Sequence, residues 1–305
     1  MNLVVGFATI IAVVALGALL AQLRVLDLAG QRMLADVAFY VATPALMLLT
    51  ISRVGLDAGL TGNVVASLGS LVLVGGTYAA LSRLAWHHAG ADVVIGALAS
   101  SYVNAGNLGI AMAAYVVGET SVIVPTLLVQ LLCVQPLALV YLDRRTGRQG
   151  AGPGMILRRL LSNPLTVASA AGVVLAATGW RLPALVLSPL ELLAGLAIPA
   201  MLLAYGVALR LSPPVGSSGH NREVVTATVL KLAVQPALAW LIGVACGLEG
   251  VVLLGVVITA GLPTAQNIFL HATRYRRGED LAREVILVTT LLSLPVALSI
   301  AFLFG

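Results

Sequence analysis

Hydrophobic residues run through the chain in long blocks that short polar stretches separate. Ten blocks approach the roughly 20 apolar residues that a helix needs to cross a bilayer, and they predict an all-α integral membrane protein. The blocks are about 3–23, 35–54, 62–85, 93–116, 120–142, 163–180, 188–209, 223–247, 250–273 and 283–304. The fourth and ninth blocks differ from the others, because each carries polar residues and helix breakers at its centre.

Composition agrees with a membrane protein. The chain has 305 residues, of which 60% are hydrophobic and 10% are charged, whereas a soluble domain carries about a quarter charged residues. A chain this apolar cannot cover a water-facing surface, so a soluble globular fold is excluded.

Basic residues predict the orientation. Of the 17 basic residues, 14 are arginines in the loops that one side of the membrane would hold. These are Arg24, Arg32, Arg83, Arg144, Arg145, Arg148, Arg158, Arg159, Arg210, Arg222, Arg274, Arg276, Arg277 and Arg283. The opposite side has Arg53 and Arg181. The positive-inside rule therefore predicts a multi-pass protein of the cell (inner) membrane with both termini outside. The net charge of +5 needs no nucleic-acid partner.

Two pairs of blocks resemble each other. "DVAFYVATPALMLL" starts at Asp36 and "ELLAGLAIPAMLLA" starts at Glu191, and each has a proline eight residues after the acid, Pro44 and Pro199, at which we expect a helix break. The two polar-centred blocks repeat at nearly the same offset. Because each half would hold five helices, an odd number, the second half would be inverted. We therefore predict a 5+5 inverted repeat with broken, crossing fourth and ninth helices, an architecture typical of secondary transporters.

The broken helices are the candidate binding site. Asn104 lies about eleven residues into its block, close to the middle of a ~30 Å core, and Pro263 is similarly deep. Unwound backbone at that depth is tolerated where it is buried in protein or lines a watery cavity. We predict that the substrate contacts Ser101, Asn104, Gly106, Asn107, Pro263, Gln266 and Asn267. The alternative is a glycine-packed helix interface with asparagines bonded to neighbouring helices.

Lys231 is the only lysine in the chain, and it lies about eight residues into the eighth block. A charge at that depth is costly and indicates function. We expect Lys231 to balance an anionic substrate or to exchange a proton, and the alternative is that it reaches back to the cytoplasmic surface.

"NAGNLGI" (Asn104 to Ile110) and "LPTAQNIFLHATRY" (Leu262 to Tyr275) resemble the two broken-helix motifs of the auxin efflux carrier family, which includes bacterial members. The closing run "REVILVTTLLSLPVAL" also resembles that family's last helix. The first motif of the family ends in a proline, and this chain has Ala111 there. The kink would then come from Gly106 and Gly109.

The resemblance implies a fold related to the bile acid/sodium symporters, with an elevator-like motion and a homodimer formed through scaffold helices. The implied domains are scaffold helices 1–2 (residues 1–60), transport-domain helices 3–5 (61–150), scaffold helices 6–7 (151–211) and transport-domain helices 8–10 (212–305). The implied substrate is a small organic anion, such as a carboxylate.

Other functions stay open. A sodium-coupled symporter of the bile acid type is the nearest alternative, and a channel would also line its path with polar residues. An enzyme would need a nucleophile–base pair or a metal cluster at depth, and the sequence offers neither, so we expect no catalytic residue, no metal and no cofactor. The coupling ion could be a proton or Na⁺. The sequence names neither the substrate nor the direction of transport.

Overall fold

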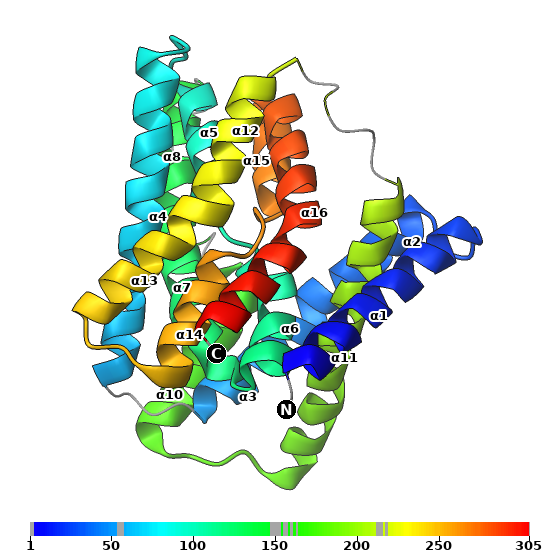
Figure 1. Cartoon of the computed structure of the whole chain (residues 1–305). Helices are drawn as coiled ribbons and strands as arrows, with labels where there is room; N and C mark the ends of the chain where they lie inside the picture. Colours follow the sequence, from blue (N-terminus) through cyan, green and yellow to red (C-terminus); the bar gives the residue numbers. More distant parts are fainter. Residues whose placement is uncertain are drawn as a thin grey trace. The chain divides into compact units, whose positions relative to one another are not determined.

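The computed structural model describes residues 3–53, 58–146, 154, 158, 161–162, 164–211, 216 and 219–304. Figure 1 shows that helices make up nearly all of this part of the chain. The described residues form no strand, and their only β-type pairing is an isolated antiparallel bridge between Val103 and Thr264. The predicted all-helical class is confirmed.

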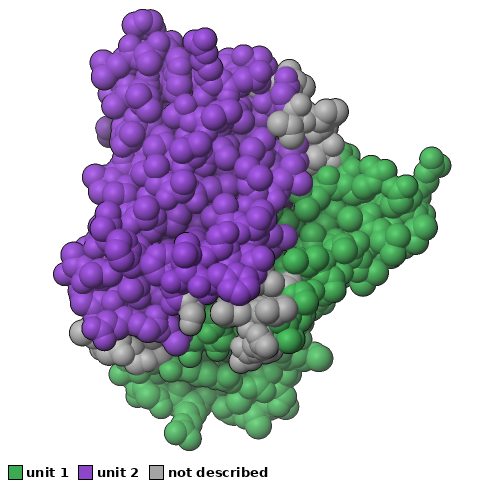
Figure 2. Space-filling view, in the orientation of Figure 1, with its two compact units in different colours: residues 1–57, 106–124, 157–212 green, residues 58–105, 125–156, 213–305 purple. Residues whose placement is uncertain are grey.

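The helices fall into two compact units (Figure 2). Unit 1 comprises residues 1–57, 106–124 and 157–212, and unit 2 comprises residues 58–105, 125–156 and 213–305. Residues 106–124, which belong to the predicted transport-domain range, therefore cluster with unit 1.

Unit 1 is built on long helices with several short helical turns between them. Its helices are α1 (Leu3–Gln22), α2 (Leu28–Val37), the π-helix η1 (Ala38–Ala42), α3 (Thr43–Ser52), α6 (Ile110–Met112), the π-helix η3 (Ala113–Val117), the 3₁₀ helix η4 (Thr120–Ile123), α10 (Pro164–Thr178) and α11 (Ala184–Leu211). The π-helix η2 (Ala105–Gly109) and α7 (Val124–Val129) begin at residues where the chain passes from one unit to the other.

Unit 2 contains the first part of the fourth block, up to Ala105, and the whole ninth block. Its helices are α4 (Ala58–Leu84), α5 (Ala91–Ser101), the π-helix η5 (Gln130–Val134), α8 (Gln135–Arg145), α12 (Asn221–Val229), the π-helix η6 (Leu230–Val234), α13 (Gln235–Ala245), α14 (Gly250–Ala260), α15 (Asn267–Tyr275) and α16 (Glu279–Phe304).

Five helical stretches of the described chain are long and apolar enough to cross a membrane. They are Leu28–Ser52, Thr61–Leu84, Ala184–Leu211, Asn221–Ala245 and Glu279–Phe304. Shorter apolar helices occupy the other five predicted blocks, at Ala8–Gln22, Ala91–Ser101, Thr120–Val129, Pro164–Thr178 and Gly250–Ala260. The protein is thus a multi-pass membrane protein, while ten spans in an inverted repeat remain a prediction.

Close helix packing holds unit 1 together. α1 packs along α11, and glycines on both helices make the approach possible. A side chain on Gly206 would collide with the carbonyl oxygen of Val14, and one on Gly17 would collide with that of Leu203. The two backbones therefore approach each other directly, as small residues allow in membrane helices.

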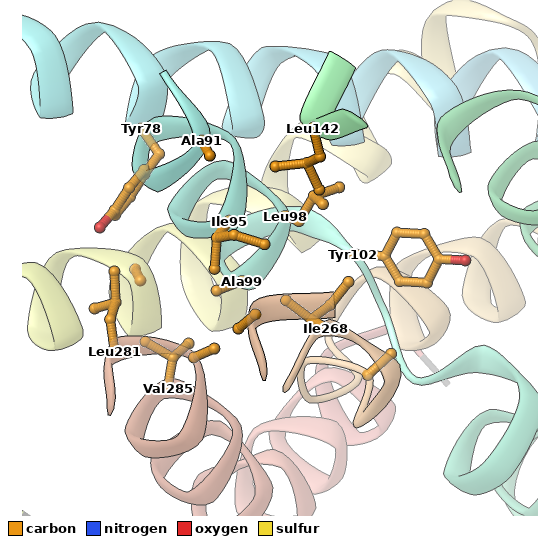
Figure 3. Packing of buried hydrophobic residues seen from close by; sticks show 14 of the residues in the cluster. Tyr78, Ala91, Ile95, Leu98, Ala99, Tyr102, Leu142, Ile268, Leu281 and Val285 are labelled. Atoms are coloured by element: carbon orange, nitrogen blue, oxygen red, sulfur yellow. The ribbon is translucent and has the colours of Figure 1, made fainter. Parts of the chain in front are cut away.

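A hydrophobic cluster fills unit 2 between its helices (Figure 3). Tyr78 of α4, Ile95 of α5, Leu142 of α8, Ile268 of α15 and Val285 of α16 are all buried in it. The cluster packs α15, the second half of the ninth block, against α5, so it supports the backbone beside the breaks.

Three prolines follow a π-turn two residues after it ends. Pro44 follows η1, Pro136 follows η5 and Pro236 follows η6. In each case the residue before the proline donates its amide five residues back, for example from Gln235 to the carbonyl of Leu230. The wider turn accommodates a proline ring, which would otherwise clash with the carbonyl four residues earlier.

The predicted helix breaks at Pro44 and Pro199 are wrong. The helical span Leu28–Ser52 continues through Pro44 by way of the π-turn, and Pro199 lies inside the uninterrupted helix α11. A proline removes one amide donor from a helix and leaves a carbonyl without its partner. In a membrane protein, groups on neighbouring helices can bond that carbonyl, so the helix continues.

Candidate functional site

The first break lies at Tyr102–Asn104. α5 ends at Ser101, and Tyr102 has an extended backbone with φ −81° and ψ 110°. Helical geometry resumes at Ala105. The expectation that Gly106 and Gly109 form the kink is therefore wrong, because both glycines lie in η2, after the helix has restarted.

The second break pairs with the first. α14 ends at Ala260 and α15 begins at Asn267. Between them, the Pro263 carbonyl accepts a hydrogen bond from the backbone N–H of Asn104 at 2.8 Å. The backbone N–H of Ala265 donates to the Tyr102 carbonyl at 3.1 Å. We call residues 102–104 and 263–267 the crossover. It brings the two polar motifs together, although Asn104 and Pro263 are 159 positions apart in the sequence.

Side chains from neighbouring helices satisfy the crossover backbone. The Gln130 amide bonds both groups of Val103, accepting from its N–H at 2.7 Å and donating to its carbonyl at 3.0 Å. The Thr289 hydroxyl accepts from the Thr264 N–H at 3.1 Å, and Gln235 Nε2 donates to the Ser101 carbonyl at 2.9 Å. These bonds replace those that a continuous helix would supply, as burial at bilayer depth requires.

Two asparagine side chains at the crossover keep unused hydrogen-bonding capacity. Nδ2 of Asn104 and Oδ1 of Asn267 are buried and have no hydrogen-bond partner in the described part of the chain. Asn104 is 3% exposed. Leaving a buried polar group unpaired costs about 1–3 kcal/mol. The Asn104 donor and the Asn267 acceptor therefore each lower the stability of the folded protein.

Tyr102 lies beside this pair. Its hydroxyl donates to Gln135 Oε1 at 3.2 Å and interacts with the Asn267 side chain. Figure 3 shows the ring at the edge of the hydrophobic cluster, with its hydroxyl directed away from the other labelled side chains.

The other predicted site residues fall into two groups. Ser101 and Pro263 are buried at the ends of the breaks, Ser101 Oγ donates to the Ala97 carbonyl at 2.7 Å, and Gln266 is partly buried before α15. Gly106 and Asn107 belong to η2 and cluster with unit 1. The side chain of Asn107 lies outside the described part of the structure.

Lys231 is fully buried in η6, and its Nζ donates to the Ala260 carbonyl at 2.7 Å. Its ammonium is therefore at the last residue of α14, and the alternative of reaching back to the membrane surface is excluded.

Sequence reasoning missed Gln235 and Thr289, which bond the crossover backbone. One signal was present, because "VQP" occurs at 134–136 and again at 234–236. In both copies the valine is the last residue of a π-turn. Each π-turn also contains a side chain that bonds the backbone of a broken helix, Gln130 in η5 and Lys231 in η6. As for metals, the described residues contain no group of three or more His, Cys, Asp or Glu side chains that could hold an ion.

Apolar helices with a polar, unwound crossover are typical of membrane transport proteins. Comparisons with known proteins agree, since a family profile described as "Membrane transport protein" matches residues 153–301. This is a family of transporters and not of enzymes.

Individual relatives narrow the class. The chain is 26% identical over 301 residues to a Rhizobium meliloti protein named "Putative malonate transporter", a match that covers 92% of this chain and 89% of that protein. It is 28% identical over 155 residues to auxin efflux carrier component 1 of Arabidopsis thaliana. That match covers 50% of this chain and 25% of the plant protein. A rice protein, probable auxin efflux carrier component 1c, is 25% identical over the same length. The resemblance to the auxin efflux carrier family is thereby confirmed, and the chain is a relative of these carriers.

Proposed function

We propose that the chain is a secondary active transporter of a small organic anion, with a carboxylate bound at the crossover between Asn104 and Asn267. The observation that carries the proposal is the pair of buried, unpartnered amide groups on two broken helices. An amide N–H donates to a carboxylate, and an amide oxygen accepts from a hydroxyl or a protonated acid.

The start of α15 supports an anionic substrate. The N-terminal end of a helix carries partial positive charge. In α15 the amides of Ile268 and Phe269 donate to the carbonyls of Ala265 and Gln266, so it is the helix dipole that favours an anion here. α15 begins at Asn267, so the residue that offers the amide oxygen is also the first residue of the helix. Half-helix N-termini contact anionic substrate groups in other transporters.

The name of the bacterial relative suggests dicarboxylates as the first substrates to test. Malonate is the substrate in that protein's name, and we extend it to this chain as a hypothesis about substrate class. The coupling ion would be a proton or Na⁺, and Lys231 would balance charge in the transport domain.

The proposed mechanism is elevator-like. In it, residues 1–60 and 151–211 form a scaffold that also makes a homodimer, and residues 61–150 and 212–305 carry the substrate across the inner membrane. Both termini would face outward. The resemblance to the auxin efflux carriers supports this assignment. The two compact units follow similar ranges, except that residues 106–124 cluster with unit 1.

Ligand-induced thermal stabilisation tests the site. Purified protein is heated with malonate and other mono- and dicarboxylates, because a ligand that binds the folded state raises the Tm by mass action. We expect Asn104→Ala and Asn267→Ala to abolish the Tm shift caused by malonate or another stabilising acid while leaving the ligand-free Tm nearly unchanged. Asn221→Ala, an exposed asparagine of α12, is the matched control and should keep the shift. Normal shifts in both crossover variants would show that the substrate binds elsewhere.

A further inference from the structure

The first halves of both broken helices end at the crossover, and one helix covers both ends. α5 ends at Ser101 and α14 ends at Ala260. The last carbonyls of a helix have no partner within it and carry partial negative charge. Gln235 donates to the Ser101 carbonyl, and Lys231 donates to the Ala260 carbonyl. Both side chains come from the continuous span Asn221–Ala245.

The Lys231 ammonium has no carboxylate to neutralise it. Among the described residues, no Asp or Glu oxygen lies within 4.0 Å of its nitrogen. The side chain is 0% exposed. A buried charge without a counter-ion is costly. The partial negative charge at the C-terminal end of α14 therefore stabilises the Lys231 ammonium. The geometry is that of a cation at the end of a half-helix.

Gln235 adds a second oxygen whose orientation is fixed. A backbone carbonyl can only accept, so the nitrogen of the Gln235 amide must face Ser101. The amide oxygen, Oε1, then points elsewhere, and it is buried without a partner among the described residues. Gln235 itself is 2% exposed. The span that carries Lys231 therefore also carries a free oxygen acceptor four residues further on.

Oxygen ligands of this kind bind hard cations. Half-helix carboxyl ends and unwound carbonyls coordinate Na⁺ in other transporters, and carbonyl and amide oxygens suit such ions. We propose that the Lys231 ammonium is a built-in cation that takes the place of an alkali cation at the end of α14. The inference deepens the proposed function, on which it rests for the role of the crossover in transport. It follows that the wild-type protein needs no Na⁺, and that removing the lysine frees the Ala260 carbonyl for Na⁺. The unpartnered Gln235 Oε1, four residues along the same span, is the proposed second ligand.

The test measures the Tm of purified full-length protein in NaCl and in choline chloride of equal concentration, with no organic anion present. We expect the same wild-type Tm in both salts. Lys231→Ala should have a Tm about 2–4 °C higher in NaCl than in choline chloride, a shift typical of modest ligand stabilisation. Lys231→Arg keeps the charge and should show no difference between the salts. Adding Gln235→Leu to Lys231→Ala should remove the response to Na⁺.

Two results would overturn the inference. One is a wild-type Tm that rises specifically with Na⁺. The other is Lys231→Ala with the same Tm in both salts, or with no folded protein recovered in either salt. Recovery of folded Lys231→Ala in NaCl alone would support the inference. Because the assay contains no anion, its failure leaves the crossover site for carboxylates intact, and the Asn104 and Asn267 variants test that site separately.

Discussion

At the scale of single residues, buried amide side chains decide what the crossover can do. Gln130 uses both of its amide groups on Val103, so it has a supporting role and little capacity left for a ligand. Asn104 and Asn267 differ, since each keeps one amide group unpaired. The difference separates residues that hold the broken backbone from residues that are available to a substrate.

Replacing Gln130 should therefore affect folding more than a comparable change beside it. Gln130→Leu leaves the N–H of Val103 buried without a partner, while the Val103 carbonyl keeps the hydrogen bond from the Ala105 N–H at 2.8 Å. The unpaired N–H costs about 1–3 kcal/mol and the lost bond to the carbonyl about 1 kcal/mol, so we expect a destabilisation of about 2–4 kcal/mol, measured as the loss of free energy of unfolding in detergent. Gln135→Leu, one turn along the same span, removes a single bond to the Tyr102 hydroxyl and should cost less. Equal losses in the two variants would contradict the bidentate role of Gln130.

At the scale of helices, irregular turns place the ligands of the crossover. Gln130 and Lys231 both lie in π-turns that a proline follows, at Pro136 and Pro236. A π-turn adds a residue to the helix and changes the face that the following side chains present. The sequence could predict that a proline disturbs these helices, but not that the helix continues through it.

The close packing of α1 against α11 in unit 1 predicts that a larger side chain at the contact destabilises the protein. Gly206→Val should destabilise the protein by about 2 kcal/mol or more, because the new side chain meets the Val14 carbonyl and overpacking costs about 1–3 kcal/mol. Gly195→Ala lies in the same helix, where an added Cβ meets no atom within 4 Å, and it should be nearly neutral. Thermal unfolding of both variants in detergent measures the difference. A neutral Gly206→Val would be incompatible with direct backbone contact between α1 and α11.

At the scale of the whole molecule, the arginine distribution predicts the membrane topology. Cys133 and Cys246 are exposed free thiols, so both are first replaced by serine. A membrane-impermeant maleimide added to intact cells should then label Trp180→Cys, beside Arg181, and should leave Thr146→Cys, beside Arg145, unlabelled. The positive-inside rule gives this direction. Labelling of Thr146→Cys alone would reverse the orientation.

The sequence predicted the helical class, the two unusual blocks and their pairing, because polar residues at bilayer depth need partners and few arrangements supply them. It misplaced the first break by several residues. Gly106 and Gly109 are flexible, but the chain unwinds at Tyr102–Asn104, where Gln130 and the second break supply the missing hydrogen bonds. Such partners come from helices far away in the sequence, so only the folded structure identifies them.

The central claim is that a carrier binds a carboxylate at the crossover, and counterflow in proteoliposomes tests it most directly. Vesicles loaded with unlabelled malonate are diluted into a trace of labelled malonate, with the other carboxylates of the binding screen run in parallel. The account predicts transient, saturable accumulation of label for at least one acid, which Asn267→Ala abolishes and Asn221→Ala leaves intact. Label that only equilibrates without accumulating, for every acid that the protein binds, would indicate a channel and contradict the account, as would undiminished counterflow in Asn267→Ala.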